Sequence, residues 1–273
     1  MAYADRGGGA PDDQTCRYGA SRMLFRGPQR NLQGRYIAVL GGTETYGKFI
    51  PEPFAALMEQ ALGLPVVNLG AVNGGLDLYL NEAAVLEVAA GAAICVVQII
   101  GAQNLSNRFY SVHPRRNDRF VMARPELRQL FPEVDFTEFS FTRHLLTVLQ
   151  RVSAERAERV VAELRQVWLE RMSLLLSHLH KPVLLWLSDQ PPPDLARIGH
   201  DPWIVDAAMI MAMRLRAAEV VEVVVNPADF DSRVSLRAGG RLEQPSLLGL
   251  PGPEAHRWAA RALVPVLHRH LVM

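Results

Sequence analysis

Five short apolar segments constrain the fold of this chain more than any other feature. Each is rich in Val, Ile or Leu and ends at or just before Gly, Asn or Asp, and they span 36–41, 65–69, 93–101, 182–188 and 219–225. Such continuous apolar runs are typical of strands that are buried on both faces of a sheet. We therefore predict a mostly parallel five-stranded sheet.

Segments with helical periodicity separate these runs, at 51–62, 78–90, 154–179, 203–218 and 254–270. In the third of them Val160, Leu164, Trp168 and Met172 recur at helical spacing, with Arg and Glu between them. Alternating strands and helices predict right-handed crossovers and a three-layer α/β/α fold of the flavodoxin-like kind. With 273 residues in total, we expect one α/β domain over 36–273 rather than two domains.

Two regions stand outside this alternation. The stretch 1–35 reads as an N-terminal leader followed by an Arg-rich arm, with residues 1–15 disordered because of their Gly, Pro and Asp content. The interval at about 106–151 contains no clear strand or helix, and we predict an insertion that is either a lid over the strand ends or an oligomer contact. A homo-oligomer built through the arm and the insertion is one hypothesis for the role of the protein.

Composition excludes several classes of partner. Lys plus Arg total 29 against 28 Asp plus Glu, so nucleic acid is not an expected partner. The two cysteines have no metal-binding spacing, and neither a disulfide nor a cofactor is predicted. The start of the chain lacks a basic segment and an apolar stretch, and no run reaches membrane-spanning length, so we expect a cytoplasmic protein with no membrane partner.

The residues directly after each strand are the candidates for chemistry, because ligands of open parallel sheets bind at the carboxyl ends of the strands. These residues read GGTETYGK, GAVNGG, AQNLSNR and DQPPPD in order, and PGPEAH enters the last helix. A sharp glycine turn can expose a hydroxyl, and amide donors at neighbouring strand ends can meet developing negative charge.

This succession resembles the SGNH or GDSL-type hydrolase superfamily over roughly residues 36–270. Its motifs are a GDS turn after the first strand, a Gly after the second, GxND after the third and a late DxxH. Gly41-Gly42-Thr43 stands at the first motif, Gly70 at the second, the run 101–104 at the third and His256 at the fourth. The resemblance implies a small-molecule acyl ester as substrate, Thr43 as nucleophile, His256 as base, and Gly70 and Asn104 as oxyanion donors.

Two positions depart from the motifs of that superfamily. Thr43 replaces the Ser, and its γ-methyl crowds the attack. Pro253 occupies the position of the Asp that orients the histidine, and Glu254, Asp189 and Glu44 are the candidate substitutes. Two hypotheses therefore stand side by side: a working esterase or acyl transferase, and a pocket that binds an anion or a sugar without turnover.

A third hypothesis is a nucleotide-binding loop, because the run from Gly42 to Lys48 satisfies GxxxxGK after a strand. Phe49 stands where such a loop needs Ser or Thr to hold magnesium, and Pro51 interrupts the join to the following helix.

The segment after the third strand carries a cluster of basic residues. We assign Arg108, His113, Arg115 and Arg116 to substrate binding together with Gly42, because guanidinium groups match carboxylate, sulfate and phosphate. Arg119 belongs to the same cluster, which implies a negatively charged substrate. The run GAQNLSNRFYSVHPRRNDRF also resembles an uncharacterised alphaproteobacterial family with a domain of unknown function.

Overall fold

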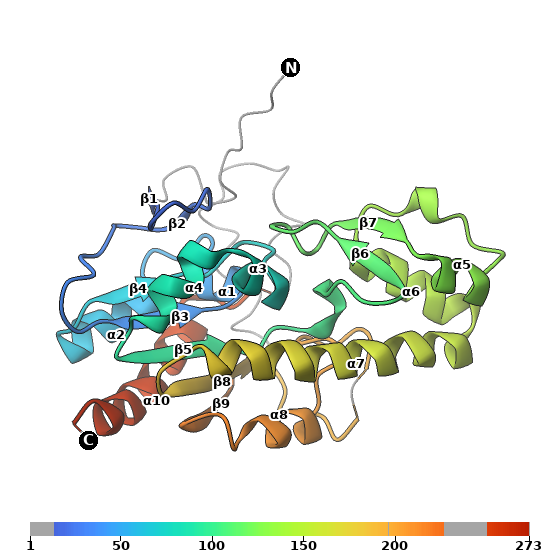
Figure 1. Ribbon diagram of the computed structural model, residues 1–273. Coiled ribbons are helices and arrows are strands. Elements are labelled where there is room, and N and C mark those ends of the chain that lie inside the picture. Colours follow the sequence, from blue (N-terminus) through green and yellow to red (C-terminus); the bar gives the residue numbers. More distant parts are fainter. Residues whose placement is uncertain (1–13, 196, 227–249, 273) are drawn as a thin grey trace.

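Five parallel strands form the central sheet in the order β4-β3-β5-β8-β9 (Figure 1). The structure is a computed structural model that describes residues 14–195, 197–226 and 250–272. The strands are β3 (Ile37–Leu40), β4 (Val66–Asn68), β5 (Ile94–Gln98), β8 (Pro182–Ser188) and β9 (Glu219–Val224). Each lies within one of the five predicted segments, so the predicted sheet is confirmed.

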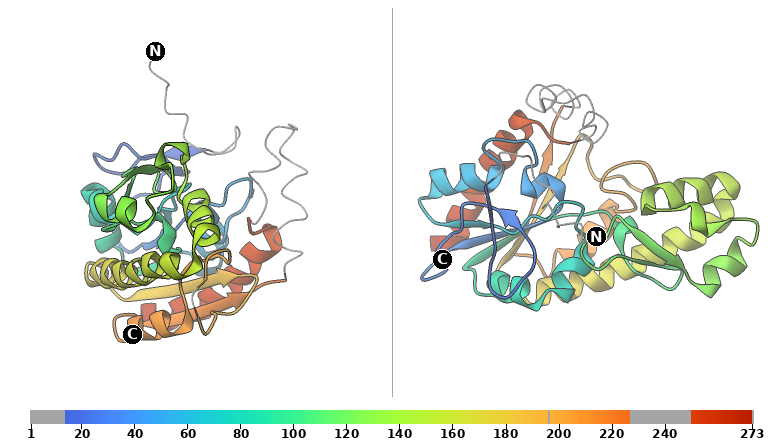
Figure 2. Two further views of the ribbon diagram at one scale, coloured as in Figure 1. Left: turned by 90° about the vertical axis from the view of Figure 1, so that its right-hand side faces the viewer. Right: turned by 90° about the horizontal axis from the view of Figure 1, so that it is seen from above.

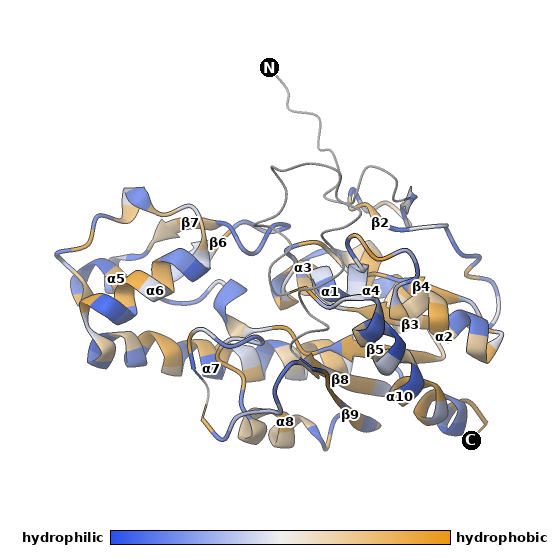
Figure 3. Cartoon of the chain, turned by 180° about the vertical axis from the view of Figure 1, so that it is seen from behind, coloured by the Kyte–Doolittle hydropathy of each residue, from blue (hydrophilic) through white to orange (hydrophobic). Residues whose placement is uncertain are grey.

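Helices cover both faces of the sheet, which confirms the three-layer fold class (Figure 2). Along β3 the side chains alternate: Ile37 and Val39 pack with α2 (Phe54–Leu62) and α10 (Pro253–Val272), whereas Ala38 and Leu40 face the opposite layer. That layer contains α3 (Leu76–Asn81), α4 (Ala83–Ala90), α7 (Ala154–Ser177) and α8 (Ala207–Met213). Burial on both sides explains why the central strands are mainly apolar in Figure 3.

The strand order creates a switch point between β3 and β5. From β3 the chain crosses to β4 on one side, and from β4 it returns to β5 on the other side of β3. Connections leave the sheet in opposite directions at such a point, so a crevice opens between the two strand ends. The glycine turn at Gly41 and Gly42 leads from β3 into the single helical turn α1 (Thr43–Tyr46), directly at this crevice.

The insertion has regular structure, which differs from the predicted irregular loop. It contains β6 (Tyr110–Val112), β7 (Phe120–Ala123), α5 (Pro125–Leu130), the 3-10 turn η2 (Phe136–Glu138) and α6 (Thr142–Val152). Aromatic side chains fill its interior, among them Phe131 and Phe136. It forms a lobe at one end of the molecule, on the extended half of α7 (Figures 1 and 2). Because α7 has 24 residues, it is ~36 Å long and reaches beyond the sheet to support this lobe.

The N-terminal arm packs on the body of the protein through buried Tyr18 and Phe25. Its strands β1 (Thr15–Cys16) and β2 (Phe25–Arg26) pair with each other, and the Arg26 guanidinium donates to the carbonyl of Ile50 at 2.8 Å. The arm is thereby fixed to the segment that follows α1. Disorder is predicted for residues 1–15: residues 1–13 lie outside the described residues, whereas Thr15 belongs to the strand β1 and is ordered by its pairing with β2. No helix in the described part of the chain has the length and apolar character to cross a bilayer.

Candidate functional site

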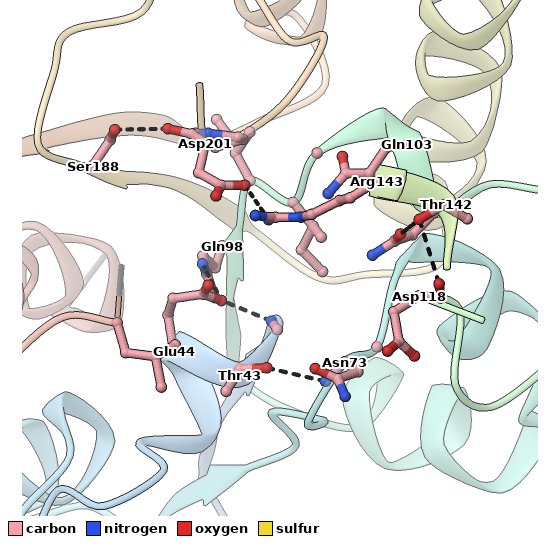
Figure 4. Close-up of a pocket in the computed structure, with 18 of the residues that line it drawn as sticks. Thr43, Glu44, Asn73, Gln98, Gln103, Asp118, Thr142, Arg143, Ser188 and Asp201 are labelled. Carbon is pink, nitrogen blue, oxygen red and sulfur yellow. Dashed lines mark hydrogen bonds and ion pairs between the residues drawn. The ribbon is translucent and has the colours of Figure 1, made fainter. Parts of the chain in front are cut away.

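A cavity of about 740 Å³, the strand-end pocket, opens at the switch point (Figure 4). Gly42, Thr43 and Glu44 line it from the end of β3. The segment 98–101 lines it from the end of β5, and Gln103 and Asn104 line it from the 3-10 turn η1 (Ala102–Asn104). Asp118 and the segment 141–144 contribute a wall from the insertion. Side chains from distant parts of the sequence therefore meet where an α/β sheet is expected to bind a ligand.

The Thr43 hydroxyl is positioned at the beginning of α1. Its Oγ1 accepts a hydrogen bond from the backbone N–H of Asn73 at 3.0 Å, across the gap between the β3 and β4 connections (Figure 4). This bond uses a lone pair of the oxygen and leaves the hydroxyl hydrogen available to another acceptor. A backbone donor on the oxygen also favours its negatively charged form.

Gln98, at the end of β5, fixes the turn that carries Thr43. Its Oε1 accepts from the Gly42 N–H at 3.1 Å and from the Thr45 hydroxyl at 2.6 Å, and its Nε2 donates to the Glu44 carboxylate at 3.2 Å. All three partners belong to the segment 42–45, so one buried amide holds this segment against the neighbouring strand.

Glu44 places its carboxylate beside Gly42, the residue that stands at the Asp position of the GDS motif. A Cβ added to Gly42 would lie 2.7 Å from Glu44 Oε2, so the Glu44 carboxylate fills the space beside residue 42. Burial raises the pKa of Glu44 above its ordinary value, and the nearby Asp201 adds to this shift. Of the predicted orienting acids, Glu44 and Asp189 line the pocket.

Gly70 lies behind α1 rather than in the lining of the pocket. Its N–H donates to the side chain of Asn68 at 2.9 Å, and a Cβ at this position would lie 2.3 Å from the Tyr46 backbone nitrogen. The glycine is needed for close packing of two backbones, and its amide is occupied. The structure therefore does not present the Gly70 N–H to a ligand, in contrast to the role that the resemblance implies.

Asn104 and Gln103 both line the pocket on the opposite side. The Thr142 hydroxyl donates to Asn104 Oδ1 at 2.7 Å, which leaves the Asn104 Nδ2 as a donor. Gln103 is buried, and its Oε1 has no partner among the described residues. Counted from Gly101, the GxND motif places its Asn at Gln103 and its Asp at Asn104. That count identifies Gln103 as a site residue that our sequence interpretation missed.

Asp118 is the second carboxylic acid of the pocket whose pKa is shifted, after Glu44. Its Oδ1 is buried and has no hydrogen-bond partner among the residues that the structure describes. Burial raises the pKa of Asp118, and the positive charges of Arg116 and Arg119 oppose the shift. Figure 4 shows its carboxylate on the same side of the pocket as Thr43 and Asn73. An unoccupied carboxylate oxygen with a raised pKa can accept a proton from a bound ligand or hydroxyl.

His256 is not among the residues that line the pocket. It is fully buried at the beginning of α10, where its Nδ1 accepts the Phe54 N–H at 3.1 Å and its ring stacks on Phe54. Its Nε2 has no partner in the described part of the chain. Burial lowers the pKa of His256 to about 3, with a smaller effect from Arg26. The structure thus does not bring His256 together with Thr43.

The other two predicted acids lie apart from each other. Asp189 lines the pocket directly after β8, where its carboxylate accepts a long hydrogen bond of 3.4 Å from the Ser188 hydroxyl. Glu254 is one residue into α10 and pairs with Arg257 on the exposed face of that helix. The His256 Nδ1, which an orienting acid would hold in a triad, bonds the Phe54 backbone instead.

The comparison with protein families gives a match over nearly the entire chain. The model of the family described as a domain of unknown function (DUF6473) matches residues 1–271. The chain belongs to this family. The resemblance to a family of unknown function is thereby confirmed, and no curated protein matches the chain.

Solved structures similar to this DUF6473 chain include three hydrolases of low sequence identity. One is described as a lipolytic protein of the G-D-S-L family from Desulfitobacterium hafniense, with 14% identity, a TM-score of 0.41, and coverage of 85% of this chain and 99% of that one. An α/β hydrolase from the metagenome of Lake Arreo has 12% identity, a TM-score of 0.46, and coverage of 86% and 95%. An acetylxylan esterase from Geobacillus stearothermophilus has 14% identity, a TM-score of 0.40, and coverage of 87% and 94%.

The DUF6473 pocket also contains an ion pair that our sequence interpretation missed. Arg143 at the beginning of α6 pairs with Asp201 from the segment after β8, and its guanidinium covers the Trp203 ring at 4.9 Å. The pair joins the insertion to the sheet across the pocket (Figure 4). The two residues come from segments far apart in sequence, so no local pattern indicated that they meet.

The predicted substrate-binding residues divide into three groups. Gly42 lines the strand-end pocket. Arg108 pairs with Glu163 of α7 at 3.1 Å, outside the pocket. His113, Arg115 and Arg116 line a second cavity together with Arg119. Most of the predicted basic cluster therefore lines a neighbouring cavity and not the strand-end pocket that contains Thr43.

The nucleotide-binding alternative does not fit the backbone of this segment. A phosphate-binding loop leads directly into a helix after its Lys, whereas here Gly47 in the left-handed conformation (φ 72°) ends α1 before Lys48. The next helix, α2, begins only at Phe54. Among the described residues, no group of three or more His, Cys, Asp or Glu side chains is placed to hold a metal ion.

Proposed function

We propose that this DUF6473 protein is an acyl-transfer enzyme, an esterase or acyl transferase, in which Thr43 attacks the acyl group of a small polar ester. The observation that carries the proposal is the Thr43 hydroxyl, which lies at the sheet switch point, is oriented by the Asn73 N–H and lines a cavity of about 740 Å³. The similarity in residue types to the GDS and GxND motifs supports the same chemistry.

Asp118 takes the role of proton acceptor in this proposal, because His256 lies outside the pocket. Its Oδ1 is unoccupied within the described residues, and its raised pKa makes it a stronger base than an ordinary aspartate. The Thr43 proton passes to the Asp118 carboxylate as Oγ1 bonds to the acyl carbon, and the protonated carboxyl then returns a proton to the leaving alkoxide. Water then attacks the acyl–Thr43 ester with the same transfer of protons through Asp118, which releases the acid and the free Thr43 hydroxyl. In a transferase a second alcohol attacks in place of water.

The Asn104 Nδ2 serves as the oxyanion donor. Thr142 occupies Asn104 Oδ1, which fixes the orientation of the amide and directs its nitrogen away from that bond. A preorganised donor of this kind contributes roughly 3–4 kcal/mol to transition-state stabilisation in acyl transfer. Gln103 supplies further polar lining at the same wall.

Substitutions at Thr43 test the nucleophile on p-nitrophenyl acetate and on acetylated sugars. Thr43→Val keeps the shape but removes the hydroxyl, so we expect turnover to fall to background. Thr43→Ser removes the γ-methyl and retains the hydroxyl, so activity is kept or increased. Thr137→Ala, which changes an exposed threonine outside the pocket, is the matched control and leaves turnover unchanged. Equal activity of the wild type and Thr43→Val contradicts the mechanism.

Asp118→Asn tests the base with an isosteric change. We expect kcat/KM to fall by ~100-fold or more, since positioned general bases contribute roughly 10²–10⁴-fold. In the wild type, kcat/KM rises with pH as Asp118 loses its proton, with a midpoint above ~3.9, the ordinary aspartate value. A flat pH profile above pH ~4 combined with full activity of Asp118→Asn excludes this role.

A second candidate function is binding without turnover. It is favoured by one specific observation: within the described residues, no histidine or carboxylate is hydrogen-bonded to the Thr43 hydroxyl. Thermal shifts with neutral sugars and acylated sugars distinguish the two, because a ligand at ~100 times its Kd adds ~2.7 kcal/mol of stability whether or not it reacts. Stabilisation by an ester that the wild type leaves intact for hours identifies the protein as a binding module.

A further inference from the structure

A second cavity, the basic hollow, adjoins the strand-end pocket between the N-terminal arm and the insertion. It has a volume of about 670 Å³. Its basic lining consists of Arg17, Arg22, His113, Arg115, Arg116 and Arg119, and no Asp or Glu of the described residues lines it. The two arginines of the arm and the three of the β6–β7 loop come from segments that are far apart in sequence, so the tertiary structure creates this concentration of positive charge.

Among the described residues, four of the five arginines of the hollow lack the carboxylate ion pair that others have. Elsewhere in the described part of the chain, the arginines that pair with Asp or Glu include Arg30, Arg108, Arg143, Arg156, Arg165, Arg171, Arg257 and Arg269. In the hollow Arg17, Arg22, Arg116 and Arg119 have no such pair with a described residue, and Arg115 has only a contact of 3.8 Å with Glu82. Guanidinium groups without a direct carboxylate ion pair around one cavity attract an anionic group with several oxygens.

The loop that carries three of these arginines is held in one conformation. His113 Nδ1 accepts the N–H groups of Arg115 and Arg116, both at 3.2 Å. The fully buried Asn117 accepts the N–H of Gly75 at 2.7 Å and donates to the His113 carbonyl at 2.9 Å. The backbone at the base of the arginine side chains is therefore preorganised, which reduces the entropy lost when a ligand binds.

The hollow and the strand-end pocket share part of their walls. Val72 and Asn73 line both cavities, and the same Asn73 donates its N–H to Thr43. Asp118 lines the strand-end pocket and is influenced by the charges of Arg116 and Arg119. A ligand that places an anionic group in the hollow thus has the rest of its body within reach of Thr43.

We propose that the basic hollow binds a phosphate or sulfate ester group of the substrate whose acyl ester lies in the strand-end pocket. Several guanidinium groups around one cavity match the three terminal oxygens of such a group better than the two oxygens of a carboxylate, and a phosphate ester adds a second negative charge. That this ligand is the substrate rests on the proposed function. The binding of the anionic group in the hollow is independent of the proposed function.

Isothermal titration calorimetry with the full chain tests the site, with glucose 6-phosphate, glucose 6-sulfate and glucose as probes. We expect one or both anionic sugars to bind and glucose to bind at least ~10-fold more weakly. Arg22→Gln and Arg116→Gln each weaken the binding by roughly 10-fold or more, as expected for charged hydrogen bonds. Both side chains are exposed, so neither variant disturbs the core.

Arg216→Gln is the matched control, since Arg216 is also exposed and lines neither cavity. Tight binding of the phosphate alone or of the sulfate alone assigns the hollow to that ester. The proposal is overturned if neither anionic sugar binds better than glucose, or if Arg216→Gln weakens the binding as much as Arg116→Gln. Thr43→Val separates the two proposals, because it abolishes turnover and leaves the binding of the anion intact.

Discussion

Two glycines beside α1, Gly42 and Gly70, differ in what a methyl group would meet. At Gly70 the added Cβ would lie 2.3 Å from the Tyr46 nitrogen and 2.7 Å from the Thr45 carbonyl carbon, both backbone atoms of α1. At Gly42 it would meet the end of the flexible Glu44 side chain at 2.7 Å. Backbone in a packed core cannot move away at low cost, whereas a carboxylate can change rotamer.

Gly70→Ala should therefore lower the free energy of unfolding more than Gly42→Ala does. We expect Gly70→Ala to lower the free energy of unfolding by ~3 kcal/mol or more, at the upper end of overpacking costs. Gly42→Ala should cost less than ~1.5 kcal/mol and displace the Glu44 carboxylate from Gln98. Urea denaturation of both variants measures the difference. Equal destabilisation by the two substitutions would show that the Gly70 contact relaxes.

The side chain of Asn117 connects the loop between β6 and β7 to the beginning of α3. Its Oδ1 accepts from Gly75 and from Leu78, and its Nδ2 donates to the His113 carbonyl. Asn107 is also buried, but its side chain bonds Leu105, Phe109 and Tyr110 within its own segment. The two asparagines thus contribute to a similar degree to the free energy of unfolding, but they hold different segments in place.

Asn117→Ala should lower the free energy of unfolding by about 2–4 kcal/mol, because buried backbone donors lose their acceptor. We expect the same substitution to weaken the binding of glucose 6-phosphate or glucose 6-sulfate, since the arginine loop loses its attachment. Asn107→Ala is the control, with a similar loss of stability and unchanged affinity. Calorimetric titration and chemical denaturation provide the two measurements, and unchanged affinity in Asn117→Ala would argue against preorganisation by this loop.

At the scale of the whole molecule, His256 makes stability depend on pH. It lies in the first turn of α10 and packs against the beginning of α2, and these two helices cover one face of the sheet. Its pKa in the folded protein, about 3, is below the unfolded value of ~6.5, so protonation favours the unfolded state. The stability it contributes is present above pH ~6.5 and is lost as the pH falls towards 3.

His256→Asn should remove this dependence while keeping an acceptor for the Phe54 N–H. Glu44, Asp77 and Asp118 have raised pKa values and act in the opposite direction, so the informative quantity is the difference between the two proteins. We expect the advantage of the wild type to shrink by ~1.4 kcal/mol per pH unit below pH ~6.5. Denaturation between pH ~4 and ~8 measures it, and parallel stability curves would refute the assignment.

Sequence patterns identified the five strands and the principal helices because burial on both faces leaves a continuous apolar signature in the chain. They also identified Thr43, Gly42 and Asn104 as residues at strand ends, and these do line one pocket. The homo-oligomer stays a prediction. The insertion differs from the predicted irregular loop, because its strands and most of its helices are short and separated by polar turns. Within it, the buried Leu145, Leu146 and Leu149 of α6 do stand at helical spacing.

The sequence by itself determined the strand ends of this protein and the residue types at them, because each strand and its turn are local in the chain. Only the tertiary structure decided which of those side chains share a cavity. It buried His256 beside Phe54, occupied the Gly70 amide with Asn68, and gathered Arg17 with Arg116 around one hollow. Such groupings depend on which distant segments pack together. The apolar pattern of each segment shows that it is buried and does not identify its partner.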